Sequence, residues 1–202
     1  MTEIRSLVFA THNAHKAREV EQMLGGDFEI KTLTDIGCLE EIAETEDTLE
    51  GNAELKAEYI RQKYKVWCFS EDTGLEVEAL GGAPGVNTAR YAGEDKNPEA
   101  NIALLLKNLK GQENRRAQFR TIIHLILPGV TIIMEGVCKG RIATEKRGNG
   151  GWGYDPVFIP DGYDKTFAEL GEALKNQISH RAKAIAMLKE SLIEFNRDQY
   201  ED

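Results

Sequence analysis

Cysteine, proline and aromatic residues are all scarce in this chain. Of its 202 residues, 3 are cysteine and 5 are proline, and aromatic residues make up 7%. The cysteines lie far apart, are odd in number and form no Cys-x-x-Cys pair, so the sequence predicts neither a disulfide framework nor a zinc site. Such a chain suits a reducing compartment, and we therefore expect a cytoplasmic protein.

Long apolar runs are also lacking. The longest, residues 122–127, is interrupted by His124, and the first apolar stretch, residues 7–10, is short and follows Glu3 and Arg5. A membrane-spanning helix needs about 20 consecutive apolar residues. We therefore expect no membrane partner and no signal peptide.

Basic residues are outnumbered, with 25 Lys and Arg against 34 Asp and Glu and a net charge of -9 at pH 7. A nucleic acid polymer is held mainly by excess basic charge, so none is expected as a partner, and any phosphate ligand must be bound by a few local cations. At 202 residues and 41% hydrophobic composition the chain can bury a core without staples. No linker, repeat or low-complexity stretch is visible, which predicts a single domain over residues 1–202.

Apolar periodicity predicts an α/β fold. Residues 7–10 are uniformly apolar, as in a strand covered on both faces, and Thr11 and Asn13 follow as candidate helix caps. The dipeptide Pro128-Gly129 separates two β-rich runs and predicts a hairpin, so the sheet is expected to be mixed. The other predicted elements are helices at 16–24, 52–65, 98–109 and 182–195, and strands at 28–33, 66–70, 75–79, 117–127 and 130–143.

Residues 11–16, Thr-His-Asn-Ala-His-Lys, lie where the first strand passes into a helix. Unpaired N–H groups and the helix dipole favour an anion there, and Lys16 adds a positive charge. A plain helix cap with a surface lysine explains the segment equally well, because no glycine-rich phosphate loop is present. For His12 and His15 we favour capping or solvent-facing roles over metal binding.

Glu71 and Asp72 are adjacent carboxylates that we place at a strand end. Crowded carboxylates repel each other unless a cation lies between them or one is protonated, so the pair indicates Mg²⁺, with Glu44 as a third oxygen ligand. Side chains alternate along a strand, so both could face one site only if the chain turned, which Gly74 would permit. The alternative is an acidic surface loop.

Two later segments could complete a nucleotide site. Residues 148–153 contain four glycines in six positions, and Trp152 among them offers a flat face for a base, or alternatively a hydrophobic plug. Residues 175–181 combine Lys175 and Arg181 with Ser179, a phosphate-binding composition or simply the start of a helix.

Together these motifs resemble the Ham1 family of inosine triphosphate pyrophosphatases, also described as dITP/XTP pyrophosphatases. The resemblance runs from about residue 7 to residue 192. It is carried by Thr-x-Asn-x-x-Lys from Thr11, Glu-Asp-Thr-Gly-Leu-Glu-Val from Glu71, Gly-Gly-Ala-Pro-Gly-Val from Gly81, Gly-Gly-Trp-Gly-Tyr-Asp-Pro from Gly150 and Ile-Ser-His-Arg from Ile178.

The resemblance implies a Mg²⁺-dependent hydrolase that converts ITP, dITP and XTP to the monophosphate and pyrophosphate. It also implies an elongated mixed β-sheet flanked by helices, two lobes around a nucleotide cleft, and a homodimer. Asp72 would be the catalytic base and a metal ligand, and Glu44 and Glu71 would support the metal. The expected substrate-binding residues are Thr11, His12, Asn13, Ala14, His15, Lys16, Lys56, Thr73, Trp152, Gly153, Tyr154, Asp155, Lys175, His180 and Arg181.

Three positions depart from the family pattern. His12 stands where many members have Gly, Glu71 where Asp is common, and Gly51 where Glu is frequent. These changes bear on metal coordination more than on activity. Two alternatives stay open: a pyrophosphatase that also accepts ordinary triphosphates, and a sensor that binds a purine triphosphate without turnover.

Overall fold

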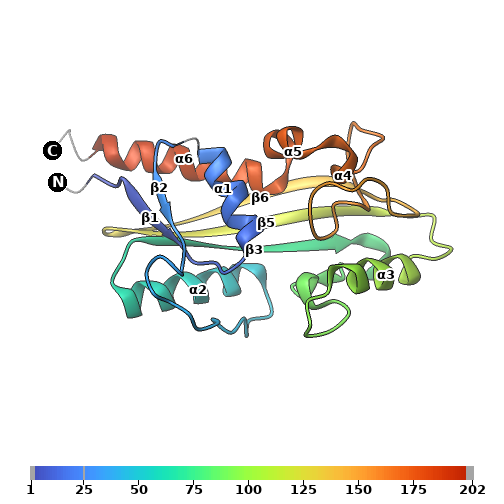
Figure 1. Cartoon of the computed structure of the whole chain (residues 1–202), viewed down its shortest axis with the longest axis horizontal. Coiled ribbons are helices and arrows are strands. Elements are labelled where there is room, and N and C mark those ends of the chain that lie inside the picture. The colour runs from blue at the N-terminus through green and yellow to red at the C-terminus, as the bar shows by residue number, and fades with distance from the viewer. Residues whose placement is uncertain (1–2, 25, 199–202) are drawn as a thin grey trace. The chain divides into compact units, whose positions relative to one another are not determined.

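The computed structural model describes residues 3–24 and 26–198 (Figure 1). These residues form two compact units. The first unit consists of Met1–Asp72, Thr121–Gly136 and Arg181–Asp202. The second consists of Thr73–Arg120 and Val137–His180. Each unit is therefore assembled from segments that are distant in sequence. Within the described residues, none of the helices has the length and apolarity required to cross a membrane.

The strands form one mixed sheet in the order β2-β1-β3-β5-β6-β7, with β4 paired to β3. Strand β1 pairs in parallel with β2 and β3, whereas the pairs β3-β4 and β6-β7 are antiparallel. The mixed α/β fold predicted from the sequence is thus confirmed. The strands are β1 (Ser6–Phe9), β2 (Glu29–Lys31), β3 (Cys68–Val77), β4 (Pro84–Gly85), β5 (Arg116–Leu127), β6 (Val130–Ile142) and β7 (Phe158–Pro160).

Six α-helices and two short 3₁₀ helices are present in the described part of the chain. The α-helices are α1 (Ala14–Leu24), α2 (Leu49–Tyr64), α3 (Pro98–Asn108), α4 (Phe167–Leu170), α5 (Glu172–Ile178) and α6 (His180–Asp198), and the 3₁₀ helices are Glu78–Leu80 and Thr88–Arg90. The four longer helices predicted from apolar spacing are confirmed, with shifted ends. The short helices α4 and α5 were not predicted, because one or two turns carry too little periodicity to detect.

In the first unit, β1 is buried on both faces, as its uniform apolar run predicted. Leu7 and Phe9 face a core that also contains residues of α1 and α6, whereas Val8 and Ala10 face residues of α2. Figure 1 shows the same arrangement, with α1 and α6 on one side of these strands and α2 on the other. Side chains alternate along a strand, so one four-residue strand supplies both layers.

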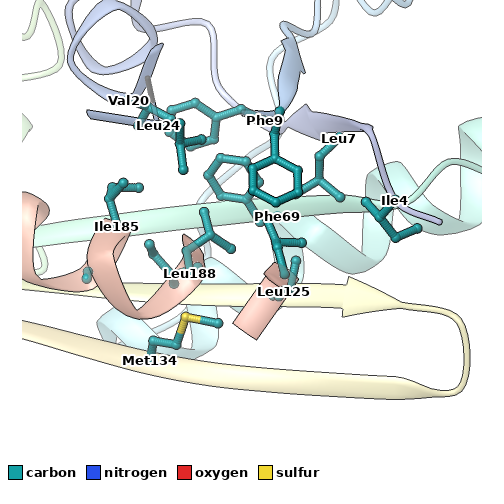
Figure 2. Close-up of a cluster of buried hydrophobic side chains, with 14 of the residues drawn as sticks. Ile4, Leu7, Phe9, Val20, Leu24, Phe69, Leu125, Met134, Ile185 and Leu188 are labelled. Atoms are coloured by element: carbon teal, nitrogen blue, oxygen red, sulfur yellow. The ribbon is translucent and has the colours of Figure 1, made fainter. Parts of the chain in front are cut away.

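Phe9 and Phe69 stack at the centre of the first of these layers, with ring centroids 4.5 Å apart and planes 6° from parallel. Figure 2 shows Val20 and Leu24 of α1 and Ile185 and Leu188 of α6 gathered around the two rings. This packing holds α1 and α6 against the carboxyl end of β1. The residues that follow β1 therefore start from a rigid base.

The second unit has a separate apolar core around Phe158. The Phe158 ring meets the Phe119 ring edge-on, with ring centroids 4.7 Å apart, and its centroid lies 5.3 Å from that of Phe167. Leu75 and Val77 from β3 and Ile102 and Leu105 from α3 belong to the same cluster.

The predicted hairpin is also confirmed, since β5 ends at Leu127 and β6 begins at Val130.

One expectation about β3 is wrong. The sequence predicted two strands, at 66–70 and 75–79, separated by a turn at Gly74. The structure has a single ten-residue strand that contains Gly74 and ends in a 3₁₀ helix at Glu78. The polar run from Ser70 to Gly74 disguised a continuous buried strand, because its charges are neutralised by partners that are distant in sequence.

Candidate functional site

The carboxylates Glu71 and Asp72 lie in the middle of β3, just beyond the end of its neighbour β1. The last paired residues of the two strands are Phe9 and Phe69, and the Ala10 N–H donates to the Phe69 carbonyl at 2.8 Å. The placement at a strand end with a turn at Gly74 is therefore wrong. Because successive side chains of a strand alternate, Glu71 and Asp72 point to opposite faces and meet different helices.

Glu71 is the anchor of a buried cationic cluster. Arg181, the second residue of α6, donates to both of its oxygens, with Nε 2.8 Å from Oε2 and Nη2 2.9 Å from Oε1. Lys16 of α1 lies 2.9 Å from Oε1, and Arg181 Nη1 donates to Glu19 at 2.5 Å. Burial acts to raise the pKa of Glu71, but the charges of Arg181 and Lys16 outweigh it and hold the pKa well below its usual value.

Asp72 faces α2 and shares Lys56 with Glu44. The Lys56 ammonium lies 2.7 Å from Glu44 Oε1, 2.7 Å from the Glu71 carbonyl oxygen and 3.5 Å from Asp72 Oδ1. Burial raises the pKa of Asp72 against the opposing charges of Lys56 and Lys16. Burial acts to lower the pKa of Lys56, but the carboxylates around it, Asp72 first, raise it overall. Lys56 is therefore held as a buried cation.

The second oxygen of Asp72, Oδ2, is buried and accepts no hydrogen bond. A buried acceptor without a donor is unfavourable by about 1–3 kcal/mol, so this oxygen suits a ligand such as a cation or a water. Within residues 3–24 and 26–198, no three carboxylate, imidazole or thiol side chains are clustered closely enough to hold a metal. Asp72 therefore has an oxygen that suits a cation, and Glu44 is linked to Asp72 because both carboxylates pair with Lys56. Glu71 differs, because both of its oxygens already accept from Arg181.

The turn between β1 and α1 is tied down by its own side chains. Asn13 caps α1, because its Oδ1 accepts from the N–H groups of His15 at 3.0 Å and Lys16 at 3.2 Å, while Thr11 Oγ1 accepts from the Asn13 N–H. The predicted cap is confirmed. Lys16 is not a surface lysine, since its side chain is 15% exposed and paired with Glu71. Ala14 is the first residue of α1.

Glu40 holds the acidic loop of residues 40–47 to α2 and was not predicted to have a role. Its Oε1 accepts from Tyr59 at 3.0 Å and Tyr64 at 3.1 Å and is paired with Lys63. Its backbone carbonyl accepts from His12 Nε2 at 2.9 Å. The loop that carries Glu44 is therefore not simply solvated, and His12 is engaged with it.

In the second unit, Asp155 organises the glycine-rich loop. Its buried Oδ2 accepts from Lys175 at 2.8 Å and from the Trp152 N–H at 3.0 Å. The Lys175 ammonium lies 5.2 Å from the centre of the Trp152 ring. A Cβ at Gly151 would lie 2.1 Å from Asp155 Oδ2, and the φ of Gly151 is +72°, so only glycine fits. The aromatic loop is thus a shaped element rather than a linker.

The other predicted substrate contacts in this unit have varied surroundings. Tyr154 is buried, and its hydroxyl donates to the Thr88 carbonyl at 2.7 Å. Its pKa is raised by burial, so the hydroxyl stays protonated. His180 stacks on Phe119 with ring centroids 4.6 Å apart. Thr73 is half-buried in β3, and Gly153 has a φ of +59°.

Nine of the eighteen predicted site residues are gathered into two groups, one in each unit, and the other nine are not part of these ion-pair and cation–ring contacts. Those brought together in the first unit are Lys16, Glu44, Lys56, Glu71, Asp72 and Arg181, and those in the second are Trp152, Asp155 and Lys175. The cluster predicted over residues 175–181 is divided between them, because Lys175 pairs with Asp155 and Arg181 with Glu71. Sequence reasoning missed Glu19 and Glu40, whose partners are far away in sequence and leave no local pattern.

A strand-to-helix turn capped by Asn13, a buried aspartate beside lysines, and an aromatic glycine loop are the features of a nucleotide-handling α/β protein. The chain belongs to the Ham1 family, whose model matches residues 7–191, and this confirms the resemblance drawn from the motifs.

Curated relatives and solved structures agree with that assignment. A dITP/XTP pyrophosphatase of Porphyromonas gingivalis is 53% identical over 94% of this chain and 98% of its own length. The structure of the Staphylococcus aureus Ham1 protein is 38% identical, covers 94% of this chain and 98% of its own, and has a TM-score of 0.85. A HAM1 protein from Coxiella burnetii is 35% identical over 95% and 100% of the two chains, with a TM-score of 0.86.

Proposed function

We propose that this protein is a Mg²⁺-dependent pyrophosphatase that hydrolyses dITP, ITP and XTP to the nucleoside monophosphate and pyrophosphate, and so removes non-standard purines from the nucleotide pool. Relatives that share half of the sequence over nine-tenths of its length carry the name dITP/XTP pyrophosphatase. The observation that carries the proposal is the buried Asp72 carboxylate, which has one oxygen without a donor and lies beside Lys56.

For the phosphates, we propose the cations of the first unit and the turn before α1. Lys16, Lys56 and Arg181 are held by carboxylates in the absence of substrate, and charge-assisted hydrogen bonds to phosphate can replace part of those pairs. Thr11, His12, Asn13, Ala14 and His15 complete the set at the start of α1, where backbone N–H groups favour anions.

For the metal, we propose Asp72 and Glu44 as the direct ligands. Both offer carboxylate oxygens, the ligand type that Mg²⁺ prefers, and they share Lys56 as a common neighbour. When bound, the ion neutralises charge on the polyphosphate. Glu71, predicted as a metal ligand, supports the site differently in our proposal: its two oxygens hold Arg181 and Lys16 in place.

For the reaction, we propose attack by a water on the α-phosphorus with pyrophosphate as the leaving group. Asp72 Oδ2 orients this water and takes one of its protons, the water oxygen forms a bond to the α-phosphorus, and the bond from that phosphorus to the bridging oxygen breaks. A raised pKa makes the ionised Asp72 carboxylate a stronger base than an exposed aspartate. Lys16 and Arg181 stabilise the charge that develops on the phosphates.

For the purine, we propose the loop of Trp152 to Asp155 with Lys175. The Trp152 ring gives a stacking face, and Asp155 with Lys175 fixes its position. Gly153, Tyr154, His180 and Thr73 complete the proposed contacts in the second unit. Selectivity for a 6-oxo purine follows if an exocyclic amine would find no acceptor, because an unpaired buried polar group costs about 1–3 kcal/mol.

The surroundings proposed for the enzyme follow the same reasoning. We propose a homodimer in the cytoplasm that acts on free nucleotides, since the net charge of -9 disfavours nucleic acid polymers. We also propose that residues 1–202 act as one domain, because neither unit is a continuous piece of chain.

The test is pyrophosphate release from ITP, dITP, XTP, ATP and GTP with Mg²⁺, for the wild type and Asp72→Asn. We expect release from the first three substrates, a 10²–10⁴-fold fall in kcat in the variant as is roughly typical for loss of a general base, and no activity in chelator until Mg²⁺ is restored. Equal rates with ATP would show a broader pyrophosphatase. Tight ITP binding without turnover would show a sensor and overturn the hydrolase.

A further inference from the structure

The Lys56 ammonium lies among oxygens, as a bound cation would. It is surrounded by three oxygens from three different residues, at 2.7 Å from Glu44 and from the Glu71 carbonyl and 3.5 Å from Asp72. The Lys56 side chain is only 10% exposed. The Glu71 carbonyl belongs to the part of β3 that extends past the end of β1, so Lys56 also replaces the hydrogen bond that a longer β1 would have donated.

The same oxygens are those proposed to hold the divalent cation. Asp72 has one oxygen facing Lys56 and one buried oxygen, Oδ2, that accepts no hydrogen bond. Two positive charges a few ångströms apart in a buried site repel strongly, because little water screens them. A divalent ion and the Lys56 ammonium therefore compete for the carboxylates of Glu44 and Asp72.

We propose that Lys56 is a built-in substitute cation: it holds Glu44 and Asp72 together when the site is empty, weakens the binding of free divalent metal, and releases the carboxylates when the metal arrives with a polyphosphate. This inference rests on the proposed metal-dependent function. A phosphate near Lys56 gives the released ammonium a new anionic partner, so metal and nucleotide each strengthen the binding of the other. By linkage, this coupling is reciprocal.

The direct test is Mn²⁺ binding without nucleotide, measured by electron paramagnetic resonance for the wild type, Lys56→Met and a control, Lys189→Met. Lys189 belongs to α6, and its ammonium is paired with Asp27 rather than with a proposed metal ligand. We expect Lys56→Met to bind Mn²⁺ at least about tenfold more tightly than the wild type, within the usual range of coupling between sites, and the control to match the wild type. Unchanged or weaker binding in Lys56→Met would overturn the proposal.

A second pair of variants shows where the gained affinity lies. Adding Asp72→Asn to Lys56→Met should abolish the gain, because the proposed ligand is then lost.

Should Lys56→Met fail to fold, Lys56→Gln keeps hydrogen-bond donors without the charge, and Mn²⁺ should raise its Tm more than that of the wild type. An equal rise in both proteins would count against the substitute-cation role.

The coupling is measured by repeating the Mn²⁺ titration with an α,β-imido analogue of ITP. We expect the analogue to tighten Mn²⁺ binding to the wild type by a larger factor than to Lys56→Met. Equal factors would refute the coupling. The arms with Mn²⁺ alone need neither nucleotide nor turnover, so they can uphold the role of Lys56 even if the protein proves not to hydrolyse ITP.

Discussion

Asp155 connects two parts of the second unit through one carboxylate. Its Oδ2 accepts from Lys175 and from the Trp152 backbone, and both side chains of the ion pair are 5% exposed. Breaking a buried ion pair by removing one partner is far more damaging than losing a surface pair, because the other charge is left buried.

Asp155→Asn should therefore lower the free energy of unfolding by about 3–5 kcal/mol, measured by urea denaturation. The matched control is Asp161→Asn, which breaks an ion pair with Arg116 whose two side chains are 45% and 47% exposed. That change should lower it by less than about 1 kcal/mol. Similar losses in the two variants would contradict the structural role given to Asp155.

His124 is a buried histidine on β5, and its Nε2 neither accepts nor donates a hydrogen bond. Burial lowers its pKa, although the charges of Glu54 and Glu58 oppose this. In the unfolded chain the imidazole takes up a proton near pH 6.5, whereas in the folded protein it does so only at lower pH. Folding is therefore weakened as the pH falls from about 6.5 toward the lower folded pKa.

His124→Leu should remove that acid-sensitive contribution. We expect the difference in unfolding free energy between pH 7 and pH 5 to be smaller than in the wild type. The measurement is urea denaturation at both pH values. Leucine is chosen because an apolar side chain fills the buried position. An unchanged pH dependence would mean that His124 does not titrate differently on folding.

At the scale of single elements, α1 begins where the chain leaves β1, and Asn13 forms its N-cap. Helix α3 begins in the same way, since Asn97 accepts from the Ala100 N–H at 3.1 Å. The two helices have 11 residues each. They therefore offer a comparison between a cap proposed to contact phosphate and a cap with no such proposal.

Asn13→Ala and Asn97→Ala should each lower the free energy of unfolding by about 1 kcal/mol, because each leaves helix N–H groups without an acceptor. Only Asn13→Ala should also raise the KM for ITP. Thermal unfolding and initial rates of pyrophosphate release measure the two effects. A KM that rises equally in both variants would show that the change is one of general stability.

The elements with strong apolar periodicity were predictable, and the polar interior of β3 was not. Helices α2, α3 and α6 carry clear apolar stripes, and the dipeptide Pro128-Gly129 predicted the hairpin of β5 and β6. In β3, Glu71 and Asp72 were placed at a strand end before a turn, because their cations come from α1, α2 and α6 and leave no local pattern in the sequence. The same reason decides which site residues were predictable. Lys16 and Asp72 belong to local sequence motifs and were predicted, whereas Glu19 and Glu40 were missed because their partners are distant in sequence.

At the scale of the whole molecule, neither compact unit is a continuous piece of chain. Their boundary falls within β3, β5 and β6 and at the start of α6, so three strands contribute residues to both units. A strand that is ordered on one side of the boundary restricts the backbone on the other side. This continuity favours a single cooperative unfolding transition over two independent ones.

The two tryptophans test this, because Trp67 lies in the first unit and Trp152 in the second. Trp152→Phe leaves fluorescence from the first unit only, and Trp67→Phe leaves fluorescence from the second. In each variant, urea unfolding followed by fluorescence and by circular dichroism should give coincident transitions. Transitions that separate in either variant would show units that unfold independently.

The hairpin of β5 and β6 also bears on how quickly the protein acquires its fold. The two-residue connection pairs a strand of 12 residues with one of 13, so their contacts join residues close together along the chain. Bringing such neighbours together requires little loss of loop entropy, whereas the parallel pairing of β1 with β3 must close a loop of more than fifty residues. We expect the hairpin to be structured in the folding transition state and β1 to dock on β3 afterwards.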